Sequence, residues 1–427
     1  MSYDTVVVGA GLAGLTAALR LSERGQRVLV VARGVGATHL APATVDVLGY
    51  LGDAQVVSPA ASVPVLTSST PNHPYAHVSA EQLATSLEWF GTKTAALGYT
   101  GNSDQNMLLP TALGVPKPSA LAPRSMSGGD LRAGGRFLFV GLKGFKDFHP
   151  TLIADNLNHA RLVVPIEARA LELEPPSSRR GDLSGRVIAG RFDTDGLTGW
   201  LAGELEHRVD PDERIGIPAV LGLRSGDANW QELEQRLQRT VFEVATLPPS
   251  VPGVRLFEAL SGALRAGGAR IVLGVRAVGA RTNHGRIEAV DVANATGTVS
   301  YPVTSVVLAT GGFASGGLEL DSFGITRETV FDLPLTGLPD AGRVRFAEHY
   351  FDAQPLATAG VAIDDQLRPL DGSGAPVYEN LHAAGAILGG ATPWKEKSGT
   401  GISVATGYAA AEAILAPAPT RVSESVR

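Results

Sequence analysis

The first thirty residues combine two short apolar runs with one segment of helical periodicity. Thr5–Val8 is β-branched and apolar and ends at a glycine, which predicts a buried strand. The apolar positions of Leu12–Leu21 have helical spacing, and Arg27–Val31 returns to the strand pattern. Uninterrupted apolar runs are typical of parallel strands that are covered on both faces. The pattern therefore predicts a βαβ unit in this segment.

The middle of the chain has a weaker pattern. Small and polar residues with scattered prolines predict loops over residues 34–80 and an irregular segment over residues 98–136, on either side of a helix at Glu81–Leu97. Further elements are predicted as a strand at Arg136–Val140 and helices at Asp147–Ala160 and Gln231–Leu237. They indicate a separate α+β unit, in a chain whose 427 residues are too many for one simple core.

Helix and strand patterns like those of the first residues return near residue 250. Val254–Ala266 has helical spacing and ends at two glycines. Strand patterns follow at Ala269–Val275, Arg286–Val292 and Val299–Ala309. The chain therefore predicts one α/β domain that is split in sequence by the middle unit.

A glycine motif joins the first predicted strand to the first predicted helix. Residues Gly9-Ala10-Gly11-Leu12-Ala13-Gly14 have the G-x-G-x-x-G spacing of dinucleotide-binding turns. The first glycine permits the tight turn, the second lets a pyrophosphate approach the helix N-terminus, and the third lets helix and strand pack closely. We predict that Gly9, Gly11, Leu12, Ala13 and Gly14 bind a dinucleotide or a flavin; the alternative is a tight turn with a structural role alone.

The second predicted strand ends in a basic residue. In dinucleotide-binding folds an acidic residue about 20 positions after the glycines holds the adenosine ribose. This chain has Arg33 there instead. The two interpretations of Arg33 are a phosphate contact, as arginine makes with a 2′-phosphate, and a solvated strand end.

A second motif follows the predicted strand near residue 305. The apolar run ends in Ala309-Thr310-Gly311-Gly312, which is similar to the second nucleotide-contacting strand of flavoproteins. We therefore add Thr310, Gly311 and Gly312 to the candidate cofactor-binding residues. The alternative is an ordinary strand that ends in a glycine turn.

A third motif lies near the end of the chain. A short predicted strand reaches Gly385, and after a loop a helix of small residues begins near Gly401. The N–H groups at such a helix N-terminus favour negative charge, as on the N1/O2 edge of a reduced flavin ring. Here the candidate cofactor-binding residues are Gly385, Ser398, Gly399, Gly401 and Ile402. The alternative is a C-terminal helix packed through its alanines.

The composition narrows the chemistry. Because the chain has no cysteine, it has no disulfide, Cys-ligated cluster or thiol pair, and an organic cofactor is expected for redox chemistry. A net charge of −6 gives no basic footprint for nucleic acid. We find no metal-ligand spacing of His, Asp and Glu, and no apolar run long enough to span a membrane. A cytoplasmic protein is expected, with peripheral contact with the inner face of the membrane through a partner left open.

The three motifs in this order resemble the flavoprotein superfamily of fumarate reductase and succinate dehydrogenase. More narrowly, the chain is similar to the B subunit of anaerobic glycerol-3-phosphate dehydrogenase, which also has a basic residue after the second strand. The segments that carry this similarity are residues 3–14, 33–39, 45–48, Gly144-Phe145-Lys146-Asp147-Phe148, 308–317 and 385–390. The resemblance implies a bound flavin (FMN by the narrower family, FAD by the superfamily).

The same resemblance implies partners and a reaction. It implies a catalytic A-type flavoprotein subunit and a C-type subunit with iron–sulfur clusters and membrane contact. It also implies oxidation of sn-glycerol 3-phosphate, a small phosphate substrate, to dihydroxyacetone phosphate, with electrons passed towards quinone. Two alternatives remain: a self-sufficient oxidoreductase of fumarate-reductase type, and a non-catalytic subunit that relays electrons through flavin.

Three residues outside the glycine motifs are weighed individually. His39 lies in the loop after the second strand, where some members of the superfamily attach flavin covalently. It is a candidate for covalent attachment, for a non-covalent flavin or phosphate contact, or for a structural role. Lys146 and His149 are weak catalytic candidates, since a phosphate ester needs a cation and alcohol oxidation needs a base. The alternative for both is a solvated helix start. We thus expect an α/β fold: a Rossmann-like flavin-binding domain of residues 1–95 and 250–427, and an inserted α+β cap of residues 96–249.

Overall fold

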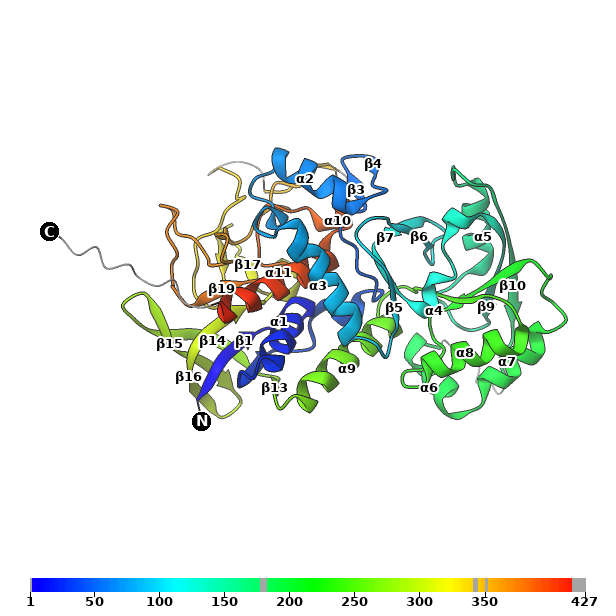
Figure 1. Cartoon of the computed structure of the whole chain (residues 1–427), viewed down its shortest axis with the longest axis horizontal. Helices are drawn as coiled ribbons and strands as arrows, with labels where there is room; N and C mark the ends of the chain where they lie inside the picture. The colour runs from blue at the N-terminus through cyan, green and yellow to red at the C-terminus, as the bar shows by residue number, and fades with distance from the viewer. Residues whose placement is uncertain (1, 177–182, 341–344, 350–351, 417–427) are drawn as a thin grey trace.

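The computed structural model describes residues 2–176, 183–340, 345–349 and 352–416. Two lobes lie side by side (Figure 1). The larger lobe holds both ends of the described chain, and the smaller lobe holds its middle part, drawn in cyan and green.

The larger lobe is built on a seven-stranded sheet with the order β13-β2-β1-β16-β15-β14, in which β19 pairs with β16. The parallel strands are β1 (Tyr3–Val8), β2 (Val28–Ala32), β13 (Arg270–Leu273), the last part of β16 (Gly297–Leu308) and β19 (Leu381–Ala383). Strands β14 (Arg276–Asn283) and β15 (Arg286–Asn294) extend β16 as an antiparallel meander. The carboxyl ends of the parallel strands meet at one edge, where α/β folds bind ligands.

Four helices cover this sheet: α1 (Leu12–Glu23), α3 (Ala80–Lys93), α9 (Val251–Ala266) and α11 (Gly399–Leu415). Helix α11 packs closely on α1, because Gly407 lies against the backbone of Ala13. A Cβ atom on Gly407 would lie 2.5 Å from the Ala13 carbonyl oxygen, so only glycine fits. This packing places the N-terminus of α11 near the glycine turn that precedes α1.

The smaller lobe has a parallel sheet of its own, with the order β10-β9-β11-β12. Its strands are β9 (Gly135–Leu142), β10 (Ile166–Leu173), β11 (Glu213–Pro218) and β12 (Val241–Val244). Its helices are α5 (Pro150–His159), α6 (Gly185–Thr194), α7 (Leu197–Leu205) and α8 (Gly226–Leu237). The main sheet of this lobe is parallel, so the expected α+β character is limited to two antiparallel pairs. They are β5 (Tyr99–Gly101) with β8 (Leu121–Pro123), and β6 (Met107–Pro110) with β7 (Pro116–Ser119).

The remaining elements are short. They are β3 (Tyr50–Leu51), β4 (Ala54–Gln55), α2 (Pro59–Ser69), β5 (Tyr99–Gly101), β6 (Met107–Pro110), β7 (Pro116–Ser119), β8 (Leu121–Pro123), α4 (Arg124–Ser127), β17 (Leu318–Leu320), β18 (Thr326–Glu328) and α10 (Pro393–Glu396). Each lobe has its own large cluster of buried apolar side chains. We propose residues 1–95 with 250–427, and 96–249, as the two domains; Ala120 and Leu121 of the second range pack in the cluster of the larger lobe.

The sequence pattern misses helix α2 in a segment that it predicts as loops. Ser58 caps this helix by accepting a hydrogen bond from the Ala61 N–H at 3.3 Å. The helix contains Pro64 and small or β-branched residues without an apolar stripe, so its periodicity is hidden. Strand β14 is also missed, because most of its side chains are not buried and their pattern has no clear alternation.

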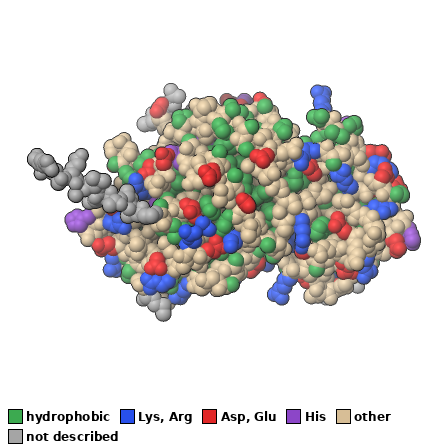
Figure 2. Space-filling view, in the orientation of Figure 1, with side chains coloured by type: hydrophobic (Ala, Val, Ile, Leu, Met, Phe, Trp, Pro, Cys, Tyr) green, Lys and Arg blue, Asp and Glu red, His purple; other side chains and the backbone are tan. Residues whose placement is uncertain are grey.

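Neither positive nor negative charge dominates the face of the molecule shown in Figure 2. Acidic and basic side chains are interspersed over both lobes in Figure 2. Within the described part of the chain, no helix combines the length and the apolar character that crossing a membrane requires.

Candidate cofactor cavity

A cavity of about 780 Å³ opens at the carboxyl edge of the larger sheet. Its walls come mainly from residues 8–13, 31–46, 309–316 and 397–403, so segments far apart in sequence meet around it. A volume of several hundred Å³ is typical of sites for small molecules and cofactors.

The first glycine motif has the geometry that its spacing predicts. Gly9 has φ +119°, and a Cβ atom there would lie 2.2 Å from the Ala309 carbonyl oxygen. A Cβ on Gly14 would lie 2.0 Å from the Gly9 carbonyl oxygen, whereas a Cβ on Gly11 would meet nothing within 4 Å. Gly9 and Gly14 therefore serve the turn and the packing, and Gly11 leaves open space towards the cavity.

Two threonines on the cavity wall have hydroxyl groups without a partner. The Oγ1 atoms of Thr38 and Thr310 are buried and make no hydrogen bond with the described residues. An unsatisfied buried hydroxyl costs free energy, which a ligand that accepts or donates a hydrogen bond would recover. These two atoms, on segments far apart in sequence, indicate that the cavity is shaped for a polar ligand.

More cationic than anionic side chains line the cavity. Arg33, Arg276 and Lys397 line the cavity, and none of them forms an ion pair within the part of the chain that the structure describes. The single lining carboxylate, Asp46, is already paired with Lys117 at 2.6 Å. The cavity therefore has an excess of positive charge and suits an anionic ligand.

The loop that carries Asp46 is held in an unusual conformation. Ala43 and Lys397 both line the cavity and both have positive φ, 65° and 51°. Left-handed conformations of residues other than glycine are costly and gather at functional sites. The Tyr99 hydroxyl donates a hydrogen bond to the Ala43 carbonyl oxygen, and the Asp46 N–H donates to Thr400 Oγ1 at 2.8 Å. Contacts from two segments that are distant in sequence therefore fix this wall.

A buried carboxylate anchors the adjoining segment just before α11. Glu396 accepts hydrogen bonds from the N–H and the hydroxyl of Thr392, from the Ser398 hydroxyl and from His73 Nε2. Burial alone would raise the pKa of Glu396, but these bonds outweigh it and lower the pKa to about 2. His73 Nδ1 accepts from the Tyr75 N–H at 3.1 Å, which leaves the proton on Nε2.

The structure brings most of the predicted cofactor-binding residues to this cavity. Those on its wall are Gly9, Gly11, Leu12, Ala13, Arg33, Thr310, Gly311, Ser398 and Gly399. Those that do not line it are Gly14, His39, Gly312, Gly385, Gly401 and Ile402.

The residues behind the wall have packing contacts instead. Gly401 faces protein, since its N–H donates to the Asp46 carbonyl oxygen at 2.9 Å and a Cβ would lie 2.5 Å from the Tyr75 hydroxyl. A Cβ on Gly385 would lie 2.7 Å from Ala13 Cβ. His39 packs edge-on against Phe257, and burial together with the charge of Arg186 lowers its pKa. A neutral His39 therefore supports the wall from outside.

The two weak catalytic candidates lie in the smaller lobe. Lys146 and His149 follow β9, are exposed, and do not line the cavity. His149 is the residue before α5 and makes no side-chain cap. The position of Lys146 and His149, exposed and just before α5, fits the alternative of a solvated helix start.

Sequence patterns missed part of the wall: Thr38, Thr44, Asp46, Arg276, Lys397 and Thr400. These residues lie mainly in segments without periodicity, so nothing local assigns them to a cavity. One feature of the sequence could have pointed to Asp46: it is a polar residue between two apolar neighbours, in one of the segments that carry the family resemblance.

Comparison with known proteins agrees with this geometry. A family model described as an FAD binding domain matches residues 4–402. The chain is 36% identical over 424 residues to the probable B subunit of anaerobic glycerol-3-phosphate dehydrogenase from Halobacterium salinarum, covering 96% of this chain and 97% of the relative. It is 30% identical to the B subunit of anaerobic glycerol-3-phosphate dehydrogenase from Vibrio cholerae, covering 97% of each chain.

The chain belongs to the family of anaerobic glycerol-3-phosphate dehydrogenase B subunits. A solved structure, 3-ketosteroid delta1-dehydrogenase from Sterolibacterium denitrificans, is similar with a TM-score of 0.44 at 12% identity, covering 96% of this chain and 99% of its own.

Members of this flavoprotein family bind a flavin, and the cavity fits one. The space beside Gly11, the unpartnered hydroxyls of Thr38 and Thr310 and the excess positive charge suit a phosphate-bearing cofactor with a polar ring. When bound, the flavin supplies two-electron redox chemistry, which no amino-acid side chain in a chain without cysteine provides. Within the described residues, no group of three or more His, Asp and Glu side chains is placed to hold a metal ion.

Proposed function

We propose that this chain is the flavin-carrying B subunit of a complex that oxidises sn-glycerol 3-phosphate to dihydroxyacetone phosphate. The observation that carries the proposal is the near full-length similarity to proteins with this name, in a chain with a cavity suited to a flavin. The electrons then pass towards quinone, with a catalytic A-type flavoprotein subunit and an iron–sulfur C-type subunit as partners. Their location is the cytoplasmic side of the membrane.

The absence of cysteine supports the need for a partner. A flavin reduced in this chain has no thiol pair or Cys-ligated cluster of the same chain to receive its electrons. They therefore leave to another subunit or to a diffusible acceptor. An iron–sulfur subunit supplies the acceptor that this chain lacks.

The residues on the cavity wall suggest how the flavin is held. We propose that Gly11, Leu12 and Ala13 receive the phosphate at the start of α1, and that Ser398 and Gly399 lie near the ring. Arg33 directly follows β2, and its side chain lies next to Gly316: a Cβ on Gly316 would lie 3.0 Å from Arg33 Nη1. A cation here favours a terminal phosphate, as in FMN, over an adenosine ribose, although FAD remains the alternative.

The experiment is to purify the chain, identify its flavin by mass spectrometry and add sn-glycerol 3-phosphate without oxygen. The proposal expects a bound flavin whose absorbance bleaches, and re-oxidation by the partner subunits. A chain that binds no flavin would contradict the whole proposal. Bleaching that requires the A-type subunit would favour the electron relay, and bleaching by other substrates alone would favour a self-sufficient enzyme.

A further inference from the structure

The described cations on the cavity wall come from two separate parts of the fold. Arg33 directly follows β2 and Arg276 is the first residue of β14, and their backbones are joined because the Val275 N–H donates to the Ala32 carbonyl oxygen at 3.2 Å. Lys397 comes instead from the short connection between α10 and α11. The wall therefore has a pair of neighbouring arginines and one lysine that stands by itself.

The arginine pair lies beside the glycine turn, which leaves the lysine for the other end of a flavin. The segment after Arg33 passes close to this turn, since a Cβ on Gly36 would lie 2.8 Å from Gly11 Cα. Phosphate binds favourably at such a turn and to guanidinium groups. When the phosphate is held there, the wall of residues 397–403 is left for the ring, in agreement with the ring position proposed above.

We propose that Lys397 raises the reduction potential of the bound flavin by stabilising the negative charge that the ring gains on reduction. The inference rests on the proposed function, because it uses the proposed position of the ring. Reduction by two electrons and one proton leaves one negative charge on the N1/O2 edge of the ring. A cation beside this edge favours the reduced flavin over the oxidised one. The effect requires no substrate in this cavity, so it applies to a subunit that relays electrons.

The described residues around Lys397 leave its charge without a counterion. Asp46, the lining carboxylate, is paired with Lys117 at 2.6 Å. Glu396, the preceding residue, uses its carboxylate to accept the hydrogen bonds of the anchor before α11. Lys397 itself is exposed on the wall and forms no ion pair or side-chain hydrogen bond with a described residue. Its charge is therefore available to a ligand that enters the cavity.

The backbone of Lys397 has a conformation that glycine would adopt at lower cost. Its φ of 51° lies in the left-handed region, which residues with a Cβ atom rarely occupy. The residue directly follows α10, and glycine is the usual residue where a helix ends in this conformation. Because the lysine side chain makes no polar contact that would offset this cost, we infer that it acts on a ligand.

The start of α11 contributes to the same effect. The N–H groups of Gly399 and Thr400 donate to none of the described residues, and both residues line the cavity. The Gly401 N–H, in contrast, donates to the Asp46 carbonyl oxygen at 2.9 Å. Helix α11 has 17 residues, so its N-terminus carries a partial positive charge. Lys397 therefore adds a full charge beside this partial one.

The test measures the reduction potential of the full chain loaded with FMN or FAD, whichever it contains after purification. The flavin is titrated with dithionite without oxygen, in the presence of a reference dye. In Lys397→Met the affinity for reduced flavin, relative to that for oxidised flavin, should fall about tenfold, which for a two-electron couple lowers the potential by about 30 mV. Affinity for oxidised flavin, measured by fluorescence, should stay near wild type, and Lys397→Arg should restore the potential.

A second variant and two matched controls separate charge from structure. Lys397→Gly relieves the left-handed backbone, so the unfolding temperature should not fall, whereas the potential should fall as in Lys397→Met. Lys395→Met removes a cation two residues away whose ammonium lies 5.1 Å from the Trp394 ring centroid and which does not line the cavity. Gln238→Gly relieves a similar backbone, with φ 52°, in the smaller lobe. Both controls should keep the wild-type potential.

The two proposals fail in different ways. A chain that binds no flavin would overturn the proposed function and the inference with it. A bound flavin whose potential is the same in wild type, Lys397→Met and Lys397→Gly would overturn the inference alone. A potential that falls in Arg276→Met but not in Lys397→Met would place the ring beside the arginine pair and would also overturn it, as would an equal fall in Lys395→Met.

Discussion

Both lobes contain parallel strands, but different residues follow them: a cavity opens at the carboxyl edge of the larger sheet, whereas buried aromatic side chains follow β9 of the smaller one. In the larger lobe, β1 is followed by Gly9 and Gly11, and the space beside Gly11 is open. In the smaller lobe, β9 is followed by Phe145 and Phe148, which are buried at 4% and 2% exposure. The same sheet edge therefore becomes a cofactor site or a packed core according to the side chains that follow the strand.

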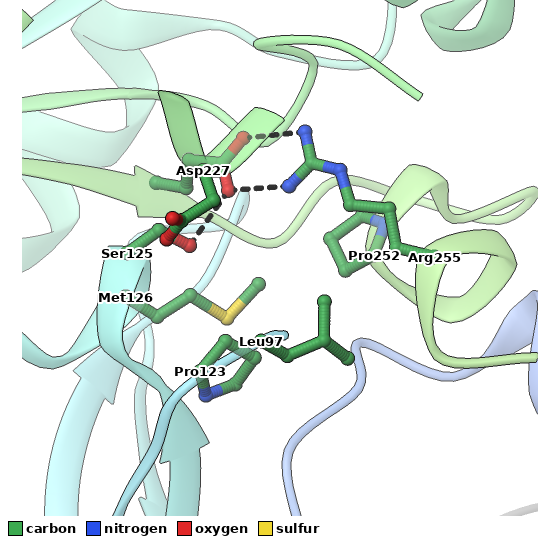
Figure 3. A pocket seen from close by; sticks show the side chains of 8 residues that line it. Leu97, Pro123, Ser125, Met126, Asp227, Pro252 and Arg255 are labelled. Carbon is green, nitrogen blue, oxygen red and sulfur yellow. Dashed lines mark hydrogen bonds and ion pairs between the residues drawn. The ribbon is translucent and has the colours of Figure 1, made fainter. Parts of the chain in front are cut away.

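The junction between the lobes is built for rigidity rather than for ligand binding. Arg255 of α9 pairs with the buried Glu243 of β12 at 2.6 and 3.0 Å and also donates to the Gly222 carbonyl oxygen. Figure 3 shows Arg255 beside Pro252, Met126 and Leu97 at this junction. The gap beside this pair has room for about 20 Å³, roughly one water molecule. Breaking such a pair would leave a buried charge without compensation, so it holds α9 against the smaller lobe.

The largest effect on flavin affinity is expected from a side chain placed in the cavity. Gly11→Leu places a side chain in open space, so the protein should fold as wild type while flavin affinity falls by more than about 100-fold. Fluorescence titration with flavin measures the loss, and thermal unfolding of the flavin-free protein checks the fold. Unchanged affinity would place the flavin elsewhere.

Removing a buried side chain after β9 of the smaller lobe should affect stability and leave flavin affinity unchanged. Phe148→Ala removes a buried ring and should cost about 3–5 kcal/mol of unfolding free energy. Flavin affinity should remain near wild type, because this residue does not line the cavity. Denaturant unfolding and flavin titration on one preparation test both parts, and a joint loss of affinity would argue against independent roles of the two edges.

The anchor of α11 should give a pH-dependent effect. The pKa of Glu396 is about 2 in the folded protein against 4.5 ordinarily, so its contribution is present above about pH 4.5 and lost as the pH falls towards 2. The contribution is up to about 3 kcal/mol from this shift. Glu396→Gln should therefore be less stable than wild type at pH 7, with the difference shrinking below pH 4.5. A difference independent of pH would contradict this.

The smallest effect is expected at the end of β2. Arg33→Glu reverses one of three cations on the wall without removing a buried contact, so flavin affinity should fall by about 10-fold, with a weaker salt dependence. Flavin titrations at two salt concentrations measure this, and Arg27→Glu, at the other end of the same strand region, is the control. Equal losses in both variants would show a nonspecific charge effect.

The sequence predicts those parts of the site that depend on neighbouring residues, and it does not predict those that depend on long-range contacts. The strand–turn–helix at Gly9–Gly14 and the turn after Thr310 depend on neighbouring residues. Their sequence pattern therefore predicts that both segments lie at the cofactor cavity. The loop with Thr38 and Asp46 has no periodicity, and its position depends on Tyr99, Thr400 and Lys117. Such long-range contacts leave no local pattern.

The middle of the chain shows the same limit. Its apolar runs predict the strand near Phe137, but no pattern there shows that β9 and β11 pair in parallel. The parallel order depends on helices that cross the sheet, and the segment between β10 and α6 carries no apolar pattern. In α11 the small residues show no local sign of their partners, yet Gly401 and Gly407 lie in close contact with Tyr75 and Ala13, which are far away in the sequence.

Amide hydrogen exchange with and without flavin tests the difference between the two edges most directly. The account predicts slower exchange over residues 9–13, 36–46, 310–316 and 397–403 when flavin is bound, with residues 143–149 after β9 unchanged. Protection after β9, or no protection around Gly11, would contradict it.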